Sequence, residues 1–327
     1  MSNSNLPAKT PNTGLSQTNN AGSILAARQT ALSPTSYSAR VTSSHPSAFV
    51  LLLDHSGSMS EYISDNRDES KEKAESVALV INKFIEEVIL TCQRTDIIKD
   101  YFELLILSYG RMDDEGNSIV SVAWEGPLQG KTWVTVNELR NSSIRKDIIE
   151  VPNPKPFGPR MLKEEQNVWI EPYAEGLTPM KKAFEVCTEY VQEWVSKHPH
   201  SFPPMVFNIT DGEVSDVNSL SELLEVADKL KSISTSDGNT LLFNLLLIED
   251  NQNRREFPII SDRHLFEENE FETALFDASS TIPGNLKKEL PATRNVVDEV
   301  KALVLLGLDM VLSFLNIGTS TLRNNIQ

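Results

Sequence analysis

The sequence predicts an α/β protein built on a doubly wound, mostly parallel sheet flanked by helices. Short, nearly continuous apolar runs recur along the chain, as expected of strands that are buried on both faces. Segments with the spacing of amphipathic helices separate these runs. Alternating strands and helices favour right-handed crossovers and a parallel sheet, and such sheets bind ligands beyond the carboxyl ends of their strands.

Four strands and three helices follow from these patterns. The strands are predicted where the chain is almost continuously apolar, over residues 48–53, 102–107, 205–209 and 241–248. The helices are predicted where apolar side chains recur at helical intervals, over residues 77–88, 180–194 and 219–230. We therefore assign residues 48–255 to one domain.

Three regions depart from this alternation. Residues 1–47 have three basic residues, no Asp or Glu and many Ser, Thr, Asn and Pro, so we expect a disordered tail. Residues 141–171 contain four closely spaced prolines and are interpreted as an inserted Pro-rich loop. Residues 256–327 are predicted to form a C-terminal helical extension, with a strongly apolar helix over residues 295–317.

Composition narrows the classes of function. The 327-residue chain carries a net charge of -16, which argues against nucleic acid because phosphate backbones are bound by clustered Lys and Arg. Its two cysteines, Cys92 and Cys187, are too few for a disulfide framework or a Cys-rich zinc site. The N-terminus lacks a signal-peptide pattern, and the best membrane candidate, residues 302–317, is too short and contains Asp309. We expect a cytoplasmic protein without a membrane segment.

A turn rich in oxygen ligands follows the first predicted strand. Asp54, Ser56 and Ser58 form an Asp-x-Ser-x-Ser motif. Gly57 allows the backbone to turn sharply enough for both hydroxyls to point at one centre. Carboxylate, hydroxyl and water oxygens in octahedral array suit Mg²⁺ or Mn²⁺. Because so short a motif also arises by chance, the site needs support from other segments.

Two further segments place oxygen ligands at the same predicted edge of the sheet. Thr178 is predicted to be the N-cap of the second amphipathic helix, with Pro179 at the first helical position. Asp211 ends another apolar strand and precedes Gly212. Three oxygen-bearing turns at one sheet edge can converge on one ion.

This ordered set resembles the metal-ion-dependent adhesion site of the von Willebrand factor A (vWA) family, which combines an Asp-x-Ser-x-Ser motif with a distant threonine and a later aspartate. The resemblance spans about residues 48–250 and includes the contexts Leu-Leu-Leu-Asp, Leu-Thr-Pro-Met and Ile-Thr-Asp-Gly-Glu. It implies a Rossmann-like vWA fold with the three hydroxyls on the ion and the two carboxylates acting directly or through water. The implied metal ligands are Asp54, Ser56, Ser58, Thr178 and Asp211.

The same resemblance implies a protein-interaction module rather than an enzyme. A partner would supply an Asp or Glu to the Mg²⁺ or Mn²⁺ ion. The arrangement is similar to bacterial tellurium-resistance-type vWA proteins, which are associated with a protein kinase and a phosphatase in stress or defence signalling. Other vWA proteins assist AAA-type ATPases. A metal-dependent phosphoester hydrolase using the same acids is the alternative from another class, and a module that binds no ion is a third.

Simpler interpretations of the same residues stay open at this point. Asp and Ser after a strand commonly cap a helix or close a turn, and capping alone accounts for Thr178. His55 lies among the predicted ligands, but its imidazole favours a transition metal, so no metal role is expected for it. Glu213 and Asp216 are interpreted as a solvated turn, with an acidic rim or a second cation as the alternative.

Overall fold

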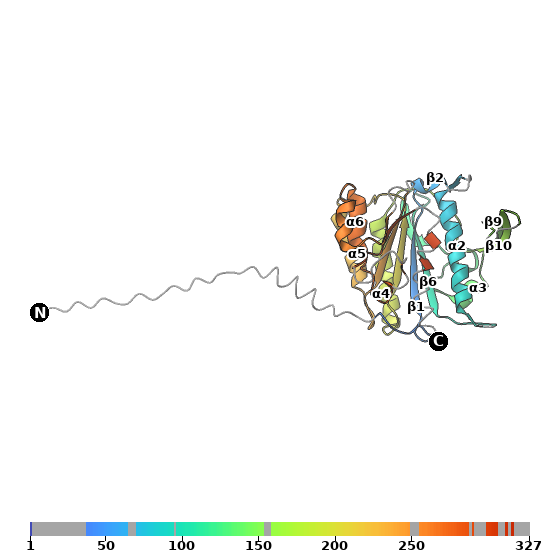
Figure 1. Ribbon diagram of the computed structural model, residues 1–327, viewed down its shortest axis with the longest axis horizontal. Coiled ribbons are helices and arrows are strands. Elements are labelled where there is room, and N and C mark those ends of the chain that lie inside the picture. Colours follow the sequence, from blue (N-terminus) through green and yellow to red (C-terminus); the bar gives the residue numbers. More distant parts are fainter. Residues whose placement is uncertain are drawn as a thin grey trace. The chain divides into compact units, whose positions relative to one another are not determined.

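A central, mostly parallel sheet confirms the predicted fold class (Figure 1). The computed structural model describes residues 1, 37–64, 70–94, 96–153, 158–248, 255–287, 290, 299–306, 311–312 and 315–316. The strands of the main sheet are β1 (Ser47–Asp54), β6 (Phe102–Met112), β7 (Ser118–Val122), β8 (Val134–Thr135), β11 (Met205–Thr210), β12 (Leu241–Leu247), β13 (Arg255–Glu256) and β14 (Leu303–Leu306).

The order of the strands brings the predicted motifs to neighbouring strands. Within the described residues the order is β13-β14-β12-β11-β1-β6-β7, and β8 also pairs with β6. The strands β14, β12, β11, β1 and β6 all run parallel. The strands β7, β8 and β13 pair antiparallel with their neighbours. Because β1 and β11 are parallel neighbours, their carboxyl ends lie at one edge.

Helices cover both faces of this sheet. The helices are α2 (Lys73–Cys92), α3 (Val136–Arg140), α4 (Met180–Lys197), α5 (Leu220–Ser232) and α6 (Glu270–Ala278), with short 3-10 turns η1 (Gly57–Ser60), η2 (Gly126–Leu128) and η4 (Ile260–Phe266). In Figure 1, α2 and α3 lie on one side of the sheet and α4, α5 and α6 on the other. The predicted helices over residues 77–88 and 180–194 are confirmed as parts of α2 and α4, and the one over residues 219–230 is confirmed as α5 from Leu220, with Ser219 at the N-cap.

The central strand β1 shows why its sequence is apolar without alternation. Every residue of β1 is buried. Phe49, Leu51 and Leu53 belong to the core on the α2 side. Ala48, Val50 and Leu52 belong to the core on the side of α4 and α5. Since successive side chains of a strand point to opposite faces, a strand covered by helices on both sides needs apolar residues at every position.

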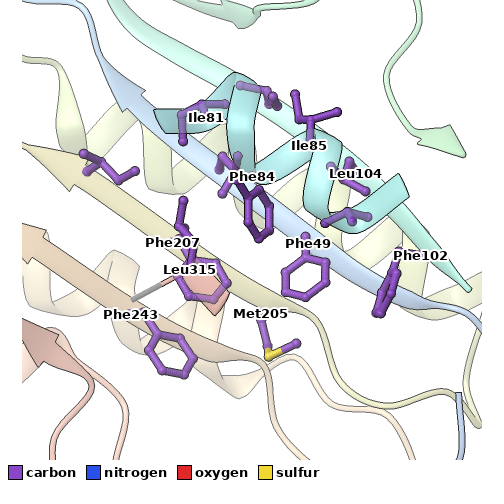
Figure 2. Packing of buried hydrophobic residues seen from close by; sticks show 14 of the residues in the cluster. Phe49, Ile81, Phe84, Ile85, Phe102, Leu104, Met205, Phe207, Phe243 and Leu315 are labelled. Carbon is purple, nitrogen blue, oxygen red and sulfur yellow. The ribbon is translucent and has the colours of Figure 1, made fainter. Parts of the chain in front are cut away.

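Aromatic side chains fill the core between the sheet and α2 (Figure 2). The ring centroid of Phe49 lies 5.8 Å from that of Phe84, 5.2 Å from that of Phe102 and 6.0 Å from that of Phe207. Phe207 in turn stacks on Phe243 at 4.8 Å. Rings at these distances pack favourably beyond the area that they bury. They fix α2, and therefore its first residue, against the strands that carry the candidate site.

The predicted Pro-rich loop over residues 141–171 is corrected by the structure, which has a β-hairpin there. β9 (Arg145–Pro152) and β10 (Met161–Val168) pair antiparallel, with Pro152 at the end of β9 and Pro159 between the two strands. The segment after the hairpin is anchored to α2, because the Asn82 side chain accepts hydrogen bonds from the backbone N–H groups of Trp169 and Ile170 at 2.8 and 3.1 Å. Residues 154–157 lie outside the described residues.

The predicted C-terminal helix over residues 295–317 is wrong at Leu303–Leu306, which form β14 and pair with β12. A short apolar run fits a buried strand as well as a buried helix, and only the neighbouring strand decides between them. Val311 and Leu315 are buried in the core beside α2. Residues 295–298, 307–310, 313–314 and 317 lie outside the described residues. No helix in the described part of the chain is long and apolar enough to cross a membrane.

The end of the predicted N-terminal tail packs on the domain. The backbone N–H groups of Ser38 and Ala39 donate to the Asp237 carboxylate at 2.9 and 3.0 Å. Val41 is fully buried. The tail predicted over residues 1–47 therefore includes an ordered segment from residue 37 onward, because Asp237 satisfies its backbone. Residues 2–36 lie outside the described residues.

Lys301, beside β14, is expected to make the stability of the fold pH-dependent. Its ammonium donates to the backbone carbonyl of Ser279 and lies 5.5 Å from the Phe276 ring centroid. Burial, with Lys231 nearby, lowers the pKa of Lys301 from 10.5 to about 8. The unfolded chain thus holds this proton more tightly, so the free energy of unfolding is expected to rise by about 2 kcal/mol between pH 8 and 10.5.

Urea unfolding of the wild type and of Lys301→Met across this pH range measures the effect. Taking the difference between the two proteins removes the contribution of other groups that titrate at alkaline pH. The difference should shift in favour of the wild type as the pH rises. Parallel pH profiles for the two proteins would show that Lys301 is not the group responsible.

Candidate metal centre

The candidate site lies at the carboxyl edge of the two central strands. Asp54 is the last residue of β1, and Asp211 directly follows β11. The strands pair in parallel with Leu53 opposite Ile209. Asp54 therefore lies at the level of Thr210, and Asp211 follows one residue further along the neighbouring strand. This is the edge at which parallel α/β sheets place their ligands.

Asp54 is held as a buried carboxylate by two hydrogen bonds. Its Oδ1 accepts from the Ser56 backbone N–H at 2.9 Å, and its Oδ2 accepts from the Thr210 hydroxyl at 2.6 Å. The residue is 1% exposed. Burial raises the pKa of Asp54 to about 6, with a further rise from Asp211, although these hydrogen bonds lower it. A carboxylate in this environment gains strongly from a nearby cation.

A chain of hydrogen bonds connects the first motif to Asp211. The Ser56 and Ser58 hydroxyl oxygens are 3.0 Å apart. The Ser58 hydroxyl donates to Asp211 Oδ1 at 2.7 Å, across 153 positions of sequence. The 3-10 turn η1 holds the loop in place, because the Met59 backbone N–H donates to the Ser56 carbonyl. The structure thus brings four of the five predicted ligands into contact.

Thr178 lies in a neighbouring loop, and its predicted capping role is wrong. The helix α4 begins at Met180, and Pro179 occupies the N-cap position without a side-chain hydrogen bond. The backbone N–H groups of Lys181 and Lys182, the second and third residues of α4, instead donate to the Asp216 carboxylate at 3.1 and 2.8 Å. A carboxylate from elsewhere in the chain therefore supplies the cap.

The Thr178 hydroxyl is consequently available for another role. The residue is 6% exposed. Its backbone N–H donates to the Ser215 hydroxyl at 3.0 Å. Within the described residues, its own hydroxyl makes no hydrogen bond, whether to the other four predicted ligands or to any other group. In the described part of the chain, this hydroxyl oxygen is not one of the buried atoms that lack a partner, so it is open to solvent and accessible to an ion.

Backbone hydrogen bonds hold the loop of residues 175–178, here called the Thr178 loop, against the Asp-x-Ser-x-Ser motif. The Gly57 N–H donates to the Gly176 carbonyl at 3.0 Å, and the Glu175 N–H donates to the His55 carbonyl at 2.7 Å. Gly110 in β6 lies against both loops, since a Cβ there would be 2.7 Å from the Ser56 nitrogen. The loops approach so closely because Gly110 and Gly176 have no side chains.

Two residues of the site were not predicted from sequence. Thr210 orients Asp54. Its place beside Asp211 at the end of a predicted strand could have indicated this. Lys73 begins α2, and its ammonium donates to Asp211 Oδ2 at 2.9 Å and to Glu61 Oε2 at 2.7 Å. Nothing in the sequence distinguishes this lysine from the chain's other basic residues, because the contact spans 138 positions.

The remaining polar residues near the motif have structural roles. The His55 ring is buried, its Nδ1 lies 3.3 Å from Arg111 Nε, and the ring packs 5.7 Å from that of Tyr173. Burial, together with Arg111, lowers the pKa of His55 to about 3. Asp216 caps α4, and Glu213 lines a hollow of about 610 Å³ between the starts of α5 and α6. This hollow does not include any of the five predicted ligands.

The donor set is chemically suited to a hard divalent cation. Two buried carboxylates and three hydroxyls supply oxygen atoms, and such sets prefer Mg²⁺ or Mn²⁺ over softer metals. In the described part of the chain, no group of three or more His, Cys, Asp or Glu side chains is arranged to hold a metal.

The comparisons with known proteins find similarity to solved structures. No known family matches the chain, and no curated protein sequence matches it. One similar solved structure is the ArnB paralog VWA2 from Sulfolobus acidocaldarius, with 13% identity and a TM-score of 0.30 over 63% of this chain and 36% of that one. Another is the human COPII-coat protein Sec24c, with 9% identity and a TM-score of 0.29 over 62% of this chain and 26% of that one. At these scores neither similarity bears on the site.

Proposed function

We propose that this chain is a vWA-type protein-interaction module that holds Mg²⁺ or Mn²⁺ and uses it to bind a carboxylate of a protein partner. The observation that carries the proposal is the hydrogen-bonded chain from Asp54 through Ser56 and Ser58 to Asp211. The Thr178 loop is locked against this chain and contributes a hydroxyl without a partner. The order of these residues is also that of the family's metal site.

Each residue of the site has a distinct part in this proposal. Ser56, Ser58 and Thr178 would hold the ion through their hydroxyl oxygens, and Asp54 and Asp211 would balance its charge directly or through water. The bound ion supplies a Lewis-acidic centre that attracts an Asp or Glu of the partner. Asp54 also fixes the Ser56 backbone, and Thr210 orients Asp54. The protein thus arranges its ligands before a partner arrives.

The surroundings of the site favour binding over catalysis. A hydrolase built on the same serines and acids needs a general base within reach of the reacting group. His55 is adjacent in sequence, but its ring packs against Tyr173, and its Nδ1 faces Arg111. With its pKa lowered to about 3, its imidazole is a weak base.

The proposed setting is the bacterial cytoplasm, in stress or defence signalling. It rests on the likeness of the motif set to tellurium-resistance-type vWA proteins. The proposed partner is a protein kinase or phosphatase that presents an Asp or Glu, and an AAA-type ATPase is the alternative partner. Because the chain carries a net charge of -16, we expect the partner's surface around its acidic ligand to be basic.

Calorimetric titration with Mg²⁺ and Mn²⁺, after EDTA treatment, tests the metal site. One ion should bind per chain, and Ser56→Ala should weaken binding by at least about tenfold because a ligand is lost. Ser60→Ala is the matched control. This exposed serine lies in the same 3-10 turn, but its hydroxyl donates to the Gly57 carbonyl. Equal affinities for wild type, Ser56→Ala and Ser60→Ala would contradict the site.

A pull-down with and without EDTA tests the role of the ion in partner binding. Partners captured in the presence of Mg²⁺ should be lost on chelation and return when Mg²⁺ is added back. Partner binding that survives chelation would rule out a cation bridge. Turnover of a phosphoester that requires Mg²⁺ and disappears in Asp54→Asn would instead favour the hydrolase.

A further inference from the structure

A buried ammonium group lies directly on one of the two site carboxylates. Lys73 Nζ is 2.9 Å from Asp211 Oδ2 and 2.7 Å from Glu61 Oε2. The Lys73 side chain is 5% exposed and that of Asp211 is fully buried, whereas Glu61 is 61% exposed. Burial lowers the pKa of Lys73, but its hydrogen bonds to Glu61 and Asp211 outweigh this and raise it. The lysine therefore stays charged.

The backbone keeps this ammonium in place. Lys73 is the first residue of α2, and its N–H donates to the Glu61 carbonyl at 3.0 Å. The start of α2 is thus attached to the loop that follows Ser56 and Ser58. Each oxygen of Asp211 accepts a hydrogen bond, because Ser58 donates to its Oδ1 while Lys73 donates to its Oδ2. A pair buried this well is held firmly, because separating it would leave an uncompensated buried charge.

The charges at the site follow from this contact. Asp54 and Asp211 contribute two negative charges, and Lys73 contributes one positive charge. A divalent ion that binds here meets a net charge of about minus one instead of minus two, so its attraction to the site is weaker. Once the ion is bound, the three side chains and the metal together carry about one positive charge, which favours an anionic ligand. Solvent screens Glu61, because it is mostly exposed.

We propose that Lys73 is a tethered counter-cation that lowers the affinity of the site for its metal and raises the affinity of the metal-loaded site for a carboxylate. The inference rests on the proposed metal site. It adds that one residue, Lys73, weakens the binding of the metal and strengthens the later binding of the partner's carboxylate. Lys73 neutralises Asp211 when no metal is bound. It also supplies the positive charge that makes the loaded site require an acidic group from the partner.

Neutral variants of Lys73 test the first half of this inference. Lys73→Met and Lys73→Gln should bind Mg²⁺ about tenfold more tightly than the wild type in calorimetric titrations, because one positive charge beside the ion is lost. Lys73→Arg keeps the charge and should stay within about threefold of the wild type. Lys181→Met is the matched control, because it removes an ion pair with Glu222 at the start of α4. It should change the affinity by less than about twofold.

Acetate binding to the Mn²⁺-loaded proteins tests the second half. Acetate that displaces water from Mn²⁺ lowers the water-proton relaxation rate. The neutral variants should need at least about threefold more acetate than the wild type for the same decrease. Lys73→Gln retains hydrogen-bonding groups, so it provides the measurement if Lys73→Met does not fold.

The outcomes separate this inference from the proposed function. If the wild type binds Mg²⁺ and the neutral variants bind it equally or more weakly, the role of Lys73 is overturned and the metal site stands. If only the neutral variants bind Mg²⁺, Lys73 acts as inferred and the metal-bound function of the wild type is contradicted. If neither the wild type nor any variant binds Mg²⁺ or Mn²⁺, the role of Lys73 and the proposed metal site are both contradicted.

Discussion

Replacing Asp54 with Asn is expected to reduce Mg²⁺ binding by at least about 100-fold and, in the same protein, to stabilise the metal-free fold. The loss of binding follows from the loss of one of two buried negative charges. The gain in stability follows from the cost of keeping that charge buried without a metal. Few substitutions in a protein core have these opposite effects, so their combination would be a signature of a metal ligand.

The sign of the stability change follows from the pKa of Asp54. It is raised by burial from 3.8 to about 6, so the folded protein holds this proton more tightly than the unfolded chain does. Folding is therefore favoured as the pH falls through 6, and above pH 6 the charged carboxylate makes it less favourable. At pH 7.5 the cost is about 2 to 3 kcal/mol, and Asn removes it.

The site can accept the amide of Asn without an unsatisfied group. The Asn oxygen can take the place of Asp54 Oδ1 and accept from the Ser56 N–H. The Asn amide can donate to the Thr210 hydroxyl oxygen, and that hydroxyl can then donate to the Gly212 carbonyl at 3.1 Å. Such rearrangement keeps the buried groups paired, so the gain from removing the charge is retained.

Urea unfolding in EDTA and calorimetric titration with Mg²⁺ measure the two effects. Asp216→Asn is the control at the same sheet edge, because Asp216 caps α4 and is not a predicted ligand. It should leave Mg²⁺ affinity within about twofold and should not stabilise the fold, because it weakens a charge-assisted cap. A metal-free Asp54→Asn that is less stable than the wild type would show that Asp54 serves the fold rather than an ion.

Gly176→Ala is expected to destabilise the protein by about 4 kcal/mol or more, or to prevent folding, because it forces apart the loops that build the site. Gly176 has φ of +65°, and a Cβ there would overlap the Gly110 carbonyl oxygen and lie 2.7 Å from the Ser118 hydroxyl. The carbonyl belongs to strand β6 and cannot move without disturbing the sheet.

Gly116→Ala separates crowding from backbone strain. Gly116 also has positive φ, +84°, but a Cβ there would meet nothing within 4 Å. This substitution should lower the free energy of unfolding by about 1 kcal/mol, because only the left-handed backbone conformation opposes it. Urea unfolding of both variants gives the difference, which measures the close approach of the loops. Similar costs at the two positions would mean that the loops around Gly176 can relax, and the site would then be less rigid than its contacts indicate.

Several parts of the fold could be predicted because their signal is local. The strands β1 and β11 are buried on both faces, so their continuous apolar runs identified them and placed Asp54 and Asp211 at their ends. The helices α2 and α4 each bury one face and therefore show helical spacing. The Asp-x-Ser-x-Ser motif follows a strand directly, so its place at the sheet edge followed from the strand.

Other parts depended on groups that are distant in sequence. The cap of α4 was assigned to Thr178 because a threonine before a helix commonly plays that part. Asp216 takes it instead, from a position beyond the next strand. The run Leu303–Leu306 was predicted to be helical, but the open edge of β12 accepts it as a strand. In both cases local propensity was overruled by a partner that no local pattern reveals.

The sequence by itself determined the fold class, the edge at which the site lies and the five residues predicted to hold an ion, because strand burial and motif order are properties of short segments. Only the tertiary structure decided that Ser58 and Lys73 both donate hydrogen bonds to Asp211 and that the Thr178 hydroxyl has no partner among the described residues. These contacts span long stretches of chain, and their energies depend on burial and on the exact placement of charges. The charge balance of the site was therefore decided by packing.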